Sequence, residues 1–189
     1  MLSAPAATRN KEPILQVLRQ YFDPNIEYKV LEIASGTGEH VTYFAEHMPN
    51  ITFQPSELNP RYLHSIVAHV DNFRLPNVRV PLCIDVRKPP DVWALPKDAG
   101  PGELDAVLNF NMIHISSNEA IHGIFRAASG LLKPSNGLLI TYGPYAINGG
   151  IMGLREVTEL EKLANTNDMK LSKIHEMPAN NHMLIFKKN

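Results

Sequence analysis

The sequence is poor in the features that mark secreted or membrane-spanning proteins. It has one cysteine in 189 residues, Cys83, so no disulfide can form within the chain, and the apolar run around it predicts a buried core residue. No apolar run approaches the ~20 residues that cross a bilayer. The start, MLSAPAATRNKEP, lacks a basic segment followed by an apolar core, so no signal peptide is expected. These absences predict an intracellular protein, cytoplasmic and/or nuclear, with no membrane partner.

Neither charge sign is in excess. Lysine and arginine total 18, aspartate and glutamate total 19, and the formal net charge is −1, which argues against nucleic acid as a partner. The eight histidines show no H-x-x-x-H or Cys/His spacing, so no metal site is expected. The hydrophobic share of 44% and the length predict a single domain over residues 1–189.

Apolar segments with the period of strands alternate with segments that have the period of helices. The expected strands cover residues 28–34, 51–55, 78–84, 104–112, 138–142, 170–177 and 183–187. The expected helices begin after an N-cap at Asn10, after the glycines near residue 38, and at residues 60, 121 and 154. This alternation predicts an α/β, Rossmann-like fold with a mostly parallel sheet, helices on both faces and a C-terminal antiparallel strand.

The stretch VLEIASGTGEH, residues 30–40, joins the first expected strand to a helix through two glycines. Ligands of open α/β sheets bind beyond the carboxyl ends of the strands, where this loop lies. Gly36 and Gly38 let backbone N–H groups of the loop, including those of Ala34 and Ser35, approach a ligand that a Cβ would exclude. A G-x-G pair alone is equally typical of a tight turn followed by a packing position.

The surrounding residues favour S-adenosylmethionine (SAM) over a dinucleotide. A dinucleotide fingerprint requires a small third residue, G-x-G-x-x-G/A, and Val41 occupies that position. Glu57 follows the second strand, where a carboxylate accepts hydrogen bonds from a ribose diol. Asp85, followed by Val86, ends the third strand, where it could accept from the adenine amino group. Glu32, within the first strand, needs a partner: it either contacts the ligand or holds the glycine loop.

The chain also resembles the seven-stranded class I SAM-dependent methyltransferases, and more closely the methyltransferase-like protein 26 family. The matching stretches are RNKEPIL, VLEIASGTGEH, FQPSELN, the run from LLKP to ITYGPYAING, and MPANNHMLIFKKN. The resemblance implies the strand order 3-2-1-4-5-7-6 and a SAM site built from Gly36, Gly38, Glu57 and Asp85, with S-adenosylhomocysteine (SAH) as product. It implies no particular acceptor.

The sequence departs from the family pattern at one place. Members carry a longer segment after TYGPYAING, with an Arg-Asn-Pro-x-Trp-Gly-Leu-Arg run, whereas here Asn148 is followed by Gly-Gly-Ile-Met and then Gly-Leu-Arg. The connection after the fifth strand commonly shapes the acceptor pocket in such folds. The shortening therefore leaves the SAM site intact and puts a complete acceptor pocket in question.

Candidates for chemistry follow the fourth and fifth strands. Methyl transfer depends mainly on alignment, and a base is needed only when the acceptor arrives protonated. Asn111 is expected to contact the methionine part of SAM. His114 is a candidate base, or a capping or packing residue, and Tyr145 is a second catalytic candidate that is equally suited to a pocket wall, as is Tyr142. The sequence N-M-I-H lacks the Asp/Asn-Pro-Pro-Tyr motif of amino-group methyltransferases.

Arg9 and Asn10 are expected to precede the first helix, where they could cover the site as an N-terminal lid, and Asn10 could equally be a plain cap. Two functions stay open: a methyltransferase acting on a small molecule or a protein side chain, and a SAM-binding module that lacks part of its acceptor pocket. A nucleotide-dependent oxidoreductase is disfavoured by Val41.

Overall fold

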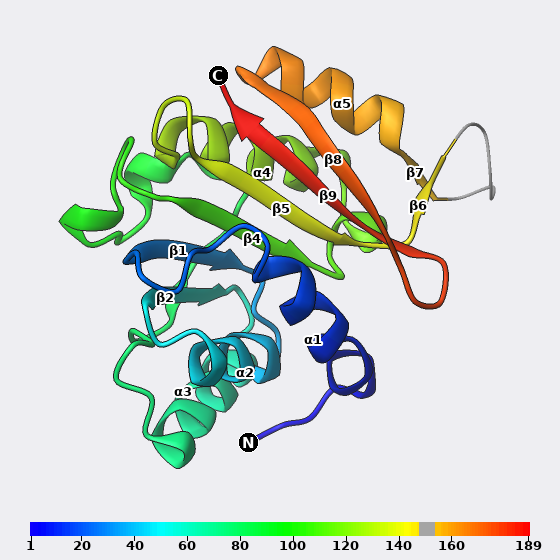
Figure 1. Ribbon diagram of the computed structural model, residues 1–189. Helices are drawn as coiled ribbons and strands as arrows, with labels where there is room; N and C mark the ends of the chain where they lie inside the picture. Colours follow the sequence, from blue (N-terminus) through cyan, green and yellow to red (C-terminus); the bar gives the residue numbers. More distant parts are fainter. Residues whose placement is uncertain (148–153) are drawn as a thin grey trace.

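The computed structural model describes residues 1–147 and 154–189 and shows one seven-stranded sheet between two layers of helices (Figure 1). The strands of this sheet are β1 (Tyr28–Ile33), β2 (Ile51–Glu57), β3 (Leu82–Cys83), β4 (Ala106–Phe110), β5 (Leu138–Gly143), β8 (Met169–Met177) and β9 (Asn181–Lys188). Their order is β3-β2-β1-β4-β5-β9-β8, and β9 runs antiparallel to both neighbours. Counted along this sheet alone, the order is the expected 3-2-1-4-5-7-6.

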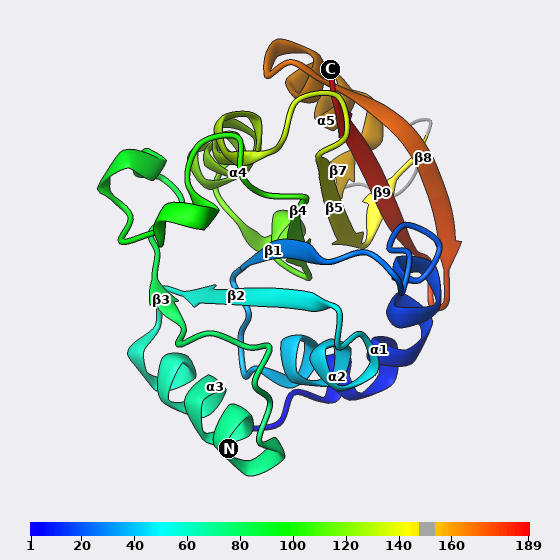
Figure 2. The same ribbon diagram turned by 60° about the vertical axis from the view of Figure 1, so that its left-hand side comes forward.

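Helices cover both faces of the sheet. On one face lie α1 (Pro5–Leu18), α2 (Glu39–His47) and α3 (Pro60–Phe73), and on the other α4 (Asn118–Leu131) and α5 (Val157–Thr166) (Figures 1 and 2). Short 3-10 turns are η1 (Pro90–Val92), η2 (Lys97–Ala99) and η3 (Ile113–Ile115). The two-residue strands β6 (Tyr145–Ala146) and β7 (Arg155–Glu156) pair with each other beside the main sheet.

Each face of the sheet has its own hydrophobic core. On the α4 face, Phe125 meets Phe186 of β9 edge to face, with ring centroids 5.2 Å apart. On the α2 face, Phe44 meets Phe110 of β4 in the same manner at 5.8 Å. Complete burial of such a side chain stabilises the fold by about 1.5–3 kcal/mol. All five residues of β4 are buried, and four of them are apolar, as is typical of a central parallel strand.

The first helix begins earlier than expected. It starts at Pro5, with Ala4 as an N-cap that makes no side-chain cap hydrogen bond, so Asn10 lies inside the helix instead of capping it. The missing cap is supplied from α2, because the Glu39 carboxylate accepts hydrogen bonds from the Ala4 backbone N–H and the Thr8 hydroxyl. A contact between residues so far apart in the chain leaves no local signal.

The third strand is shorter than expected, and Cys83 is exposed instead of buried. Val78 forms an isolated bridge with Phe53, and regular pairing resumes only at Leu82. Pro81 lies between these two points and has no N–H to donate to a ladder. Because β3 is the edge of the sheet, the Cys83 side chain has no outer neighbour to cover it.

In the described ranges, no helix combines the length and the apolar character that crossing a membrane requires.

Candidate functional site

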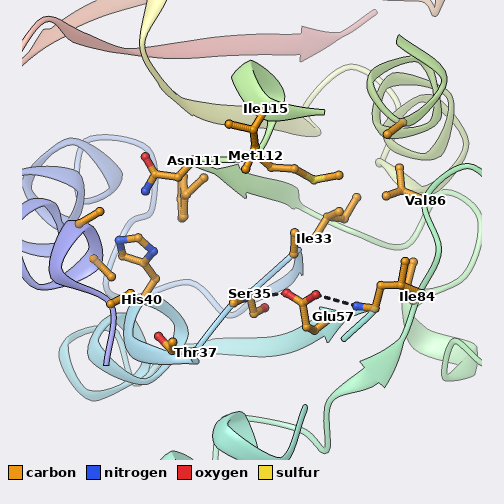
Figure 3. Close-up of a pocket in the computed structure, with 18 of the residues that line it drawn as sticks. Ile33, Ser35, Thr37, His40, Glu57, Ile84, Val86, Asn111, Met112 and Ile115 are labelled. Atoms are coloured by element: carbon orange, nitrogen blue, oxygen red, sulfur yellow. Dashed lines mark hydrogen bonds between the residues drawn. The ribbon is translucent and has the colours of Figure 1, made fainter. Parts of the chain in front are cut away.

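A cavity of about 440 Å³ opens at the carboxyl ends of the parallel strands, where ligands of such sheets bind. We call it the loop cavity, because the turn Ala34–Thr37 after β1 forms its floor. Figure 3 shows Ile33 and Ser35 on this floor, with Met112 and Ile115 facing them from the other side. His40 and Asn111 lie at one end of the cavity, and Ile84 and Val86 lie at the other.

Ala34 and Asn111 are the first residues beyond the neighbouring strands β1 and β4, and both line the loop cavity. Both have a left-handed backbone, with φ of 58° at Ala34 and 56° at Asn111. Residues other than glycine adopt this conformation at a cost, and such strain collects at functional sites. Two adjacent strands therefore end in a strained residue that turns the chain across the cavity.

The two loop glycines have different roles. Gly36 (φ 56°) lines the cavity, and a Cβ built on it would meet no atom within 4 Å, so its backbone faces open space. Gly38 (φ 95°) does not line the cavity. A Cβ there would lie 3.0 Å from the Cα of Ile66, so Gly38 lets α2 approach α3. Of the two glycines expected to contact a ligand, only Gly36 lines the cavity, whereas Gly38 allows close packing of the two helices.

Glu57 ends β2 and ties the glycine loop to the next element of the chain. One carboxylate oxygen accepts from the Gly36 N–H at 2.9 Å, and the other accepts from the Leu58 N–H at 2.8 Å (Figure 3). This second oxygen also accepts from the Asn59 N–H at 3.1 Å. A carboxylate offers about four acceptor positions, so one remains for a ligand. Ser35 adds a second attachment, donating its N–H to the Ser56 carbonyl at 2.8 Å.

The far end of the cavity is apolar with a charged margin. Ile84, Asp85 and Val86 line it together, as the sequence predicted for the last two. Both Asp85 oxygens also accept hydrogen bonds from the Arg87 guanidinium, at 2.8 and 2.7 Å, and this pairing lowers the Asp85 pKa. At the mouth, the side chains of Leu58 and Ile115 are 49% and 77% exposed. Apolar side chains so exposed at a cavity mouth suit a flat, partly apolar ligand.

Glu32 lies beneath the loop and does not line the cavity. Its side chain is 2% exposed, and burial raises its pKa to about 7, with a further contribution from the negative charge of Glu57. The Ser35 hydrogen bond opposes this rise. The Glu32 carbonyl accepts from the Ser56 hydroxyl at 2.8 Å. Of the two roles that the sequence left open, this position favours holding the loop over contacting the ligand.

His40, in the first turn of α2, lines the loop cavity and was not predicted as a site residue. Its Nε2 lies 2.7 Å from Oδ1 of Asn10, and because an amide oxygen only accepts, Nε2 carries the proton. Burial lowers the His40 pKa to about 4, so the ring is neutral at pH 7. A polar residue directly after the glycines is the signal from which His40 could have been proposed.

A second cavity, of about 370 Å³, lies between α1 and the loop that joins β8 to β9, and we call it the hairpin cavity. Ala6 and Asn111 line both cavities, so the two adjoin there. The remaining lining residues are Arg9, Asn10, Pro13, His114, Tyr142, Pro144, Pro178, Ala179 and Asn181. Arg9 and Asn10 thus lie within α1 instead of preceding it, and both line the hairpin cavity.

The two predicted catalytic residues are placed differently. His114, in η3, lines the hairpin cavity, and burial lowers its pKa. Tyr145 is buried in β6 and lines neither cavity, and burial raises its pKa. A Cβ built on Gly143 would lie 3.3 Å from His114 Nδ1 and 3.7 Å from the Tyr145 hydroxyl. Both side chains therefore lie near Gly143, but only His114 lines the hairpin cavity.

Asn109, two residues before Asn111, is fully buried within β4. Its amide donates to the Ile33 carbonyl at 3.1 Å and joins β4 to β1. The shortened segment after Asn148 falls on residues 148–153, which lie outside the described residues. Among residues 1–147 and 154–189, no three His, Cys, Asp or Glu side chains lie close enough together to hold a metal ion.

The fold is that of the class I methyltransferases. An O-methyltransferase family protein from Burkholderia thailandensis matches with a TM-score of 0.77 and 14% identity, over 97% of this chain and 57% of that one. CalO1, a methyltransferase in calicheamicin biosynthesis whose structure holds SAH, matches at 0.71 and 12%, over 96% and 55%. The cyclase SpnF matches at 0.72 and 12%, over 94% and 81%. The chain thus spans little more than half the length of these two methyltransferases.

The chain belongs to the family described as "Protein of unknown function (DUF938)". The match covers residues 1–153 and, as a second part, residues 150–188. The two parts overlap at residues 150–153, within the segment in which the sequence departs from the pattern of the methyltransferase-like family.

Proposed function

We propose that this protein is a SAM-dependent methyltransferase. The observation that carries the proposal is the loop cavity, in which the exposed backbone of Gly36 and the carboxylate of Glu57 lie next to an apolar end formed by Ile84 and Val86. Fold likeness alone is insufficient, because the same fold is also found in a cyclase. The residues of this chain have to fit the cofactor.

The residues fit SAM in three respects. The space beside Gly36 is open, so a ligand can approach the loop backbone closely. Glu57 keeps an acceptor position free for a ribose hydroxyl. The apolar end, with Asp85 at its margin, suits an adenine ring and its amino group. The polar end, with His40 and Asn111, would then hold the methionine part next to the hairpin cavity.

A dinucleotide fits less well. The third position of its fingerprint is Val41, which is fully buried within α2, so no small residue there lets this helix pack close to the sheet. In this chain Gly38 allows close packing, but it does so between α2 and α3.

In the proposed reaction SAM supplies an electrophilic methyl group, to which the acceptor's nucleophile bonds while the sulfonium sulfur keeps the electron pair of the broken bond. Asn111 lies at the junction of the cavities, where its amide can hold the methionine part of SAM in line with the acceptor. His114 has its pKa lowered by burial, so it is neutral at pH 7 and can take the proton that an acceptor hydroxyl or amine releases. Tyr145 lines neither cavity and has no part in this step.

The second candidate, a SAM-binding module that turns over slowly, is favoured by the family match that breaks at residues 150–153. The test is an acceptor screen with radiolabelled SAM on two chains, the present one and one lengthened after Asn148 by the family segment. We expect equal SAH affinity in both chains and much slower methyl transfer by the present chain. Equal transfer rates would show that the segment is dispensable. Absence of SAH binding in both would remove both candidates.

A further inference from the structure

The hairpin cavity is lined by a single charged side chain among the described residues, that of Arg9. Its other polar side chains are three asparagines, one histidine and one tyrosine, and no carboxylate lines it. Burial keeps the Tyr142 phenol neutral by raising its pKa, and it keeps His114 neutral by lowering its pKa. The cavity therefore presents one positive charge and several neutral hydrogen-bonding groups.

Arg9 differs from its polar neighbours on α1. Thr8 bonds to Glu39, Glu12 bonds to Tyr43, and the Lys11 ammonium lies 4.8 Å from the centre of the Tyr43 ring, so these residues all contact α2. Over the described ranges, the Arg9 guanidinium makes no ion pair or hydrogen bond, although acidic residues outnumber basic ones in the sequence. A guanidinium binds a carboxylate through two parallel hydrogen bonds, and Arg9 is free to do so.

The size and the walls of the cavity point to a small molecule. Its volume, about 370 Å³, falls at the lower end of the range for small-molecule sites. Three of its residues are prolines, Pro13, Pro144 and Pro178, which offer no backbone N–H and hold their backbone rigidly. Because Ala6 and Asn111 line both cavities, a molecule held at Arg9 can extend to the polar end of the loop cavity.

We propose that the hairpin cavity binds a small acceptor bearing one carboxylate, and that Arg9 holds this carboxylate. The proposal rests on the proposed function, because it assumes that the loop cavity takes the methyl donor. Arg9 then selects anionic over neutral acceptors. The selecting contact comes from helix α1 and not from the sheet.

The test uses benzoate and its neutral analogue benzamide as probes, added to protein that is saturated with SAH. Binding is followed by the backbone amide signals of Ala6, Arg9 and Asn111 in ¹⁵N-correlated NMR spectra. Because Arg9 is exposed, solvent weakens its pair with a carboxylate, and benzoate should bind roughly two- to fivefold more tightly than benzamide. Arg9→Gln should reduce benzoate binding to the level of benzamide, and Arg9→Lys should retain part of the difference. Arg19→Gln, at the other end of α1 and outside the cavity, should change nothing.

Equal binding of the two probes, undiminished benzoate binding by Arg9→Gln, or no benzoate response at any soluble concentration would each overturn the proposal. Added salt provides a further check, because an exposed guanidinium is screened and benzoate affinity should fall while benzamide affinity stays constant. SAH binding is measured first in the same samples. Its absence would remove the proposed function, whereas SAH binding without a benzoate response removes only the carboxylate acceptor.

Discussion

Asn10 and His40 join the two cavities through one hydrogen bond, 2.7 Å from Oδ1 to Nε2. Asn10 lines the hairpin cavity from α1, and His40 lines the loop cavity from α2. The position of α1 over the site therefore depends on a buried, neutral imidazole that also forms part of the cofactor cavity wall.

Removing the amide of Asn10 should destabilise the protein. Asn10→Ala leaves the buried N–H of His40 without a partner, which costs about 1–3 kcal/mol of unfolding free energy. The control is Gln20→Ala, because the exposed Gln20 amide only reaches the Gln16 carbonyl at 3.5 Å. Urea denaturation of both variants measures the difference. If Asn10→Ala were as stable as Gln20→Ala, the hydrogen bond would not hold α1 in place.

Alanine at Gly36 should weaken SAH binding, and alanine at Gly102 should not. Both glycines have positive φ, 56° and 70°, and at both a Cβ meets no protein atom within 4 Å. Each substitution therefore carries the same backbone cost, about 1–2 kcal/mol. Only Gly36 lines the loop cavity. Calorimetric titration of both variants with SAH separates the effect of backbone strain from the loss of a ligand contact. Equal SAH affinities of the two variants would show that the loop does not approach the ligand.

Replacing Glu57 by alanine should affect ligand and fold together. The substitution removes the acceptor of three backbone N–H groups, those of Gly36, Leu58 and Asn59, so the melting temperature should fall. Loss of a charge-assisted bond to the ribose should weaken SAH binding about ten- to a hundredfold. Glu161→Ala, on the exposed face of α5, serves as the control. Unchanged SAH affinity in a folded Glu57→Ala protein would remove Glu57 from the site.

Glu32 and His40 should affect stability in opposite directions as the pH changes. The native pKa of Glu32, about 7, lies above its ordinary 4.5, so its contribution is full below pH 4.5 and is lost as the pH rises to 7. The native pKa of His40, about 4, lies below its ordinary 6.5, so its contribution is present above pH 6.5 and is lost as the pH falls to 4. At about 1.4 kcal/mol per pKa unit, each contributes roughly 3 kcal/mol.

The two contributions should offset each other between pH 4.5 and 6.5. Relative to the native chain, Glu32→Gln should gain stability as the pH rises through this window, and His40→Gln should lose it. Urea denaturation of the three proteins at several pH values measures both slopes. Identical pH profiles for all three would show that neither buried group titrates as stated.

The sequence was sufficient to predict those features of the fold and the site that depend on a local pattern of residues. The strand–glycine–helix pattern of VLEIASGTGEH and the spacing to Glu57 and Asp85 placed these residues at the carboxyl ends of adjacent strands, and Gly36, Glu57 and Asp85 line the same cavity. Helix α3 begins at Pro60, as expected, with Asn59 as its N-cap and the proline at its first position.

The sequence was not sufficient to predict features that depend on contacts between residues far apart in the chain. The start of α1 depends on Glu39, and the burial of Tyr145 depends on how β6 packs beside η3. The hairpin cavity combines α1, the ends of β4 and β5, and the β8–β9 loop, which no local pattern brings together. The separate roles of Gly36 and Gly38 required the position of α3.

The most direct test of the account is calorimetric titration of the unmodified chain with SAH, SAM and NAD under the same conditions. The account predicts that SAH and SAM bind at one site per chain and that NAD does not bind. It also predicts that saturating SAH suppresses the heat of SAM binding, because both occupy the loop cavity. Binding of NAD in place of SAH, or no binding of SAH by the folded chain, would contradict it.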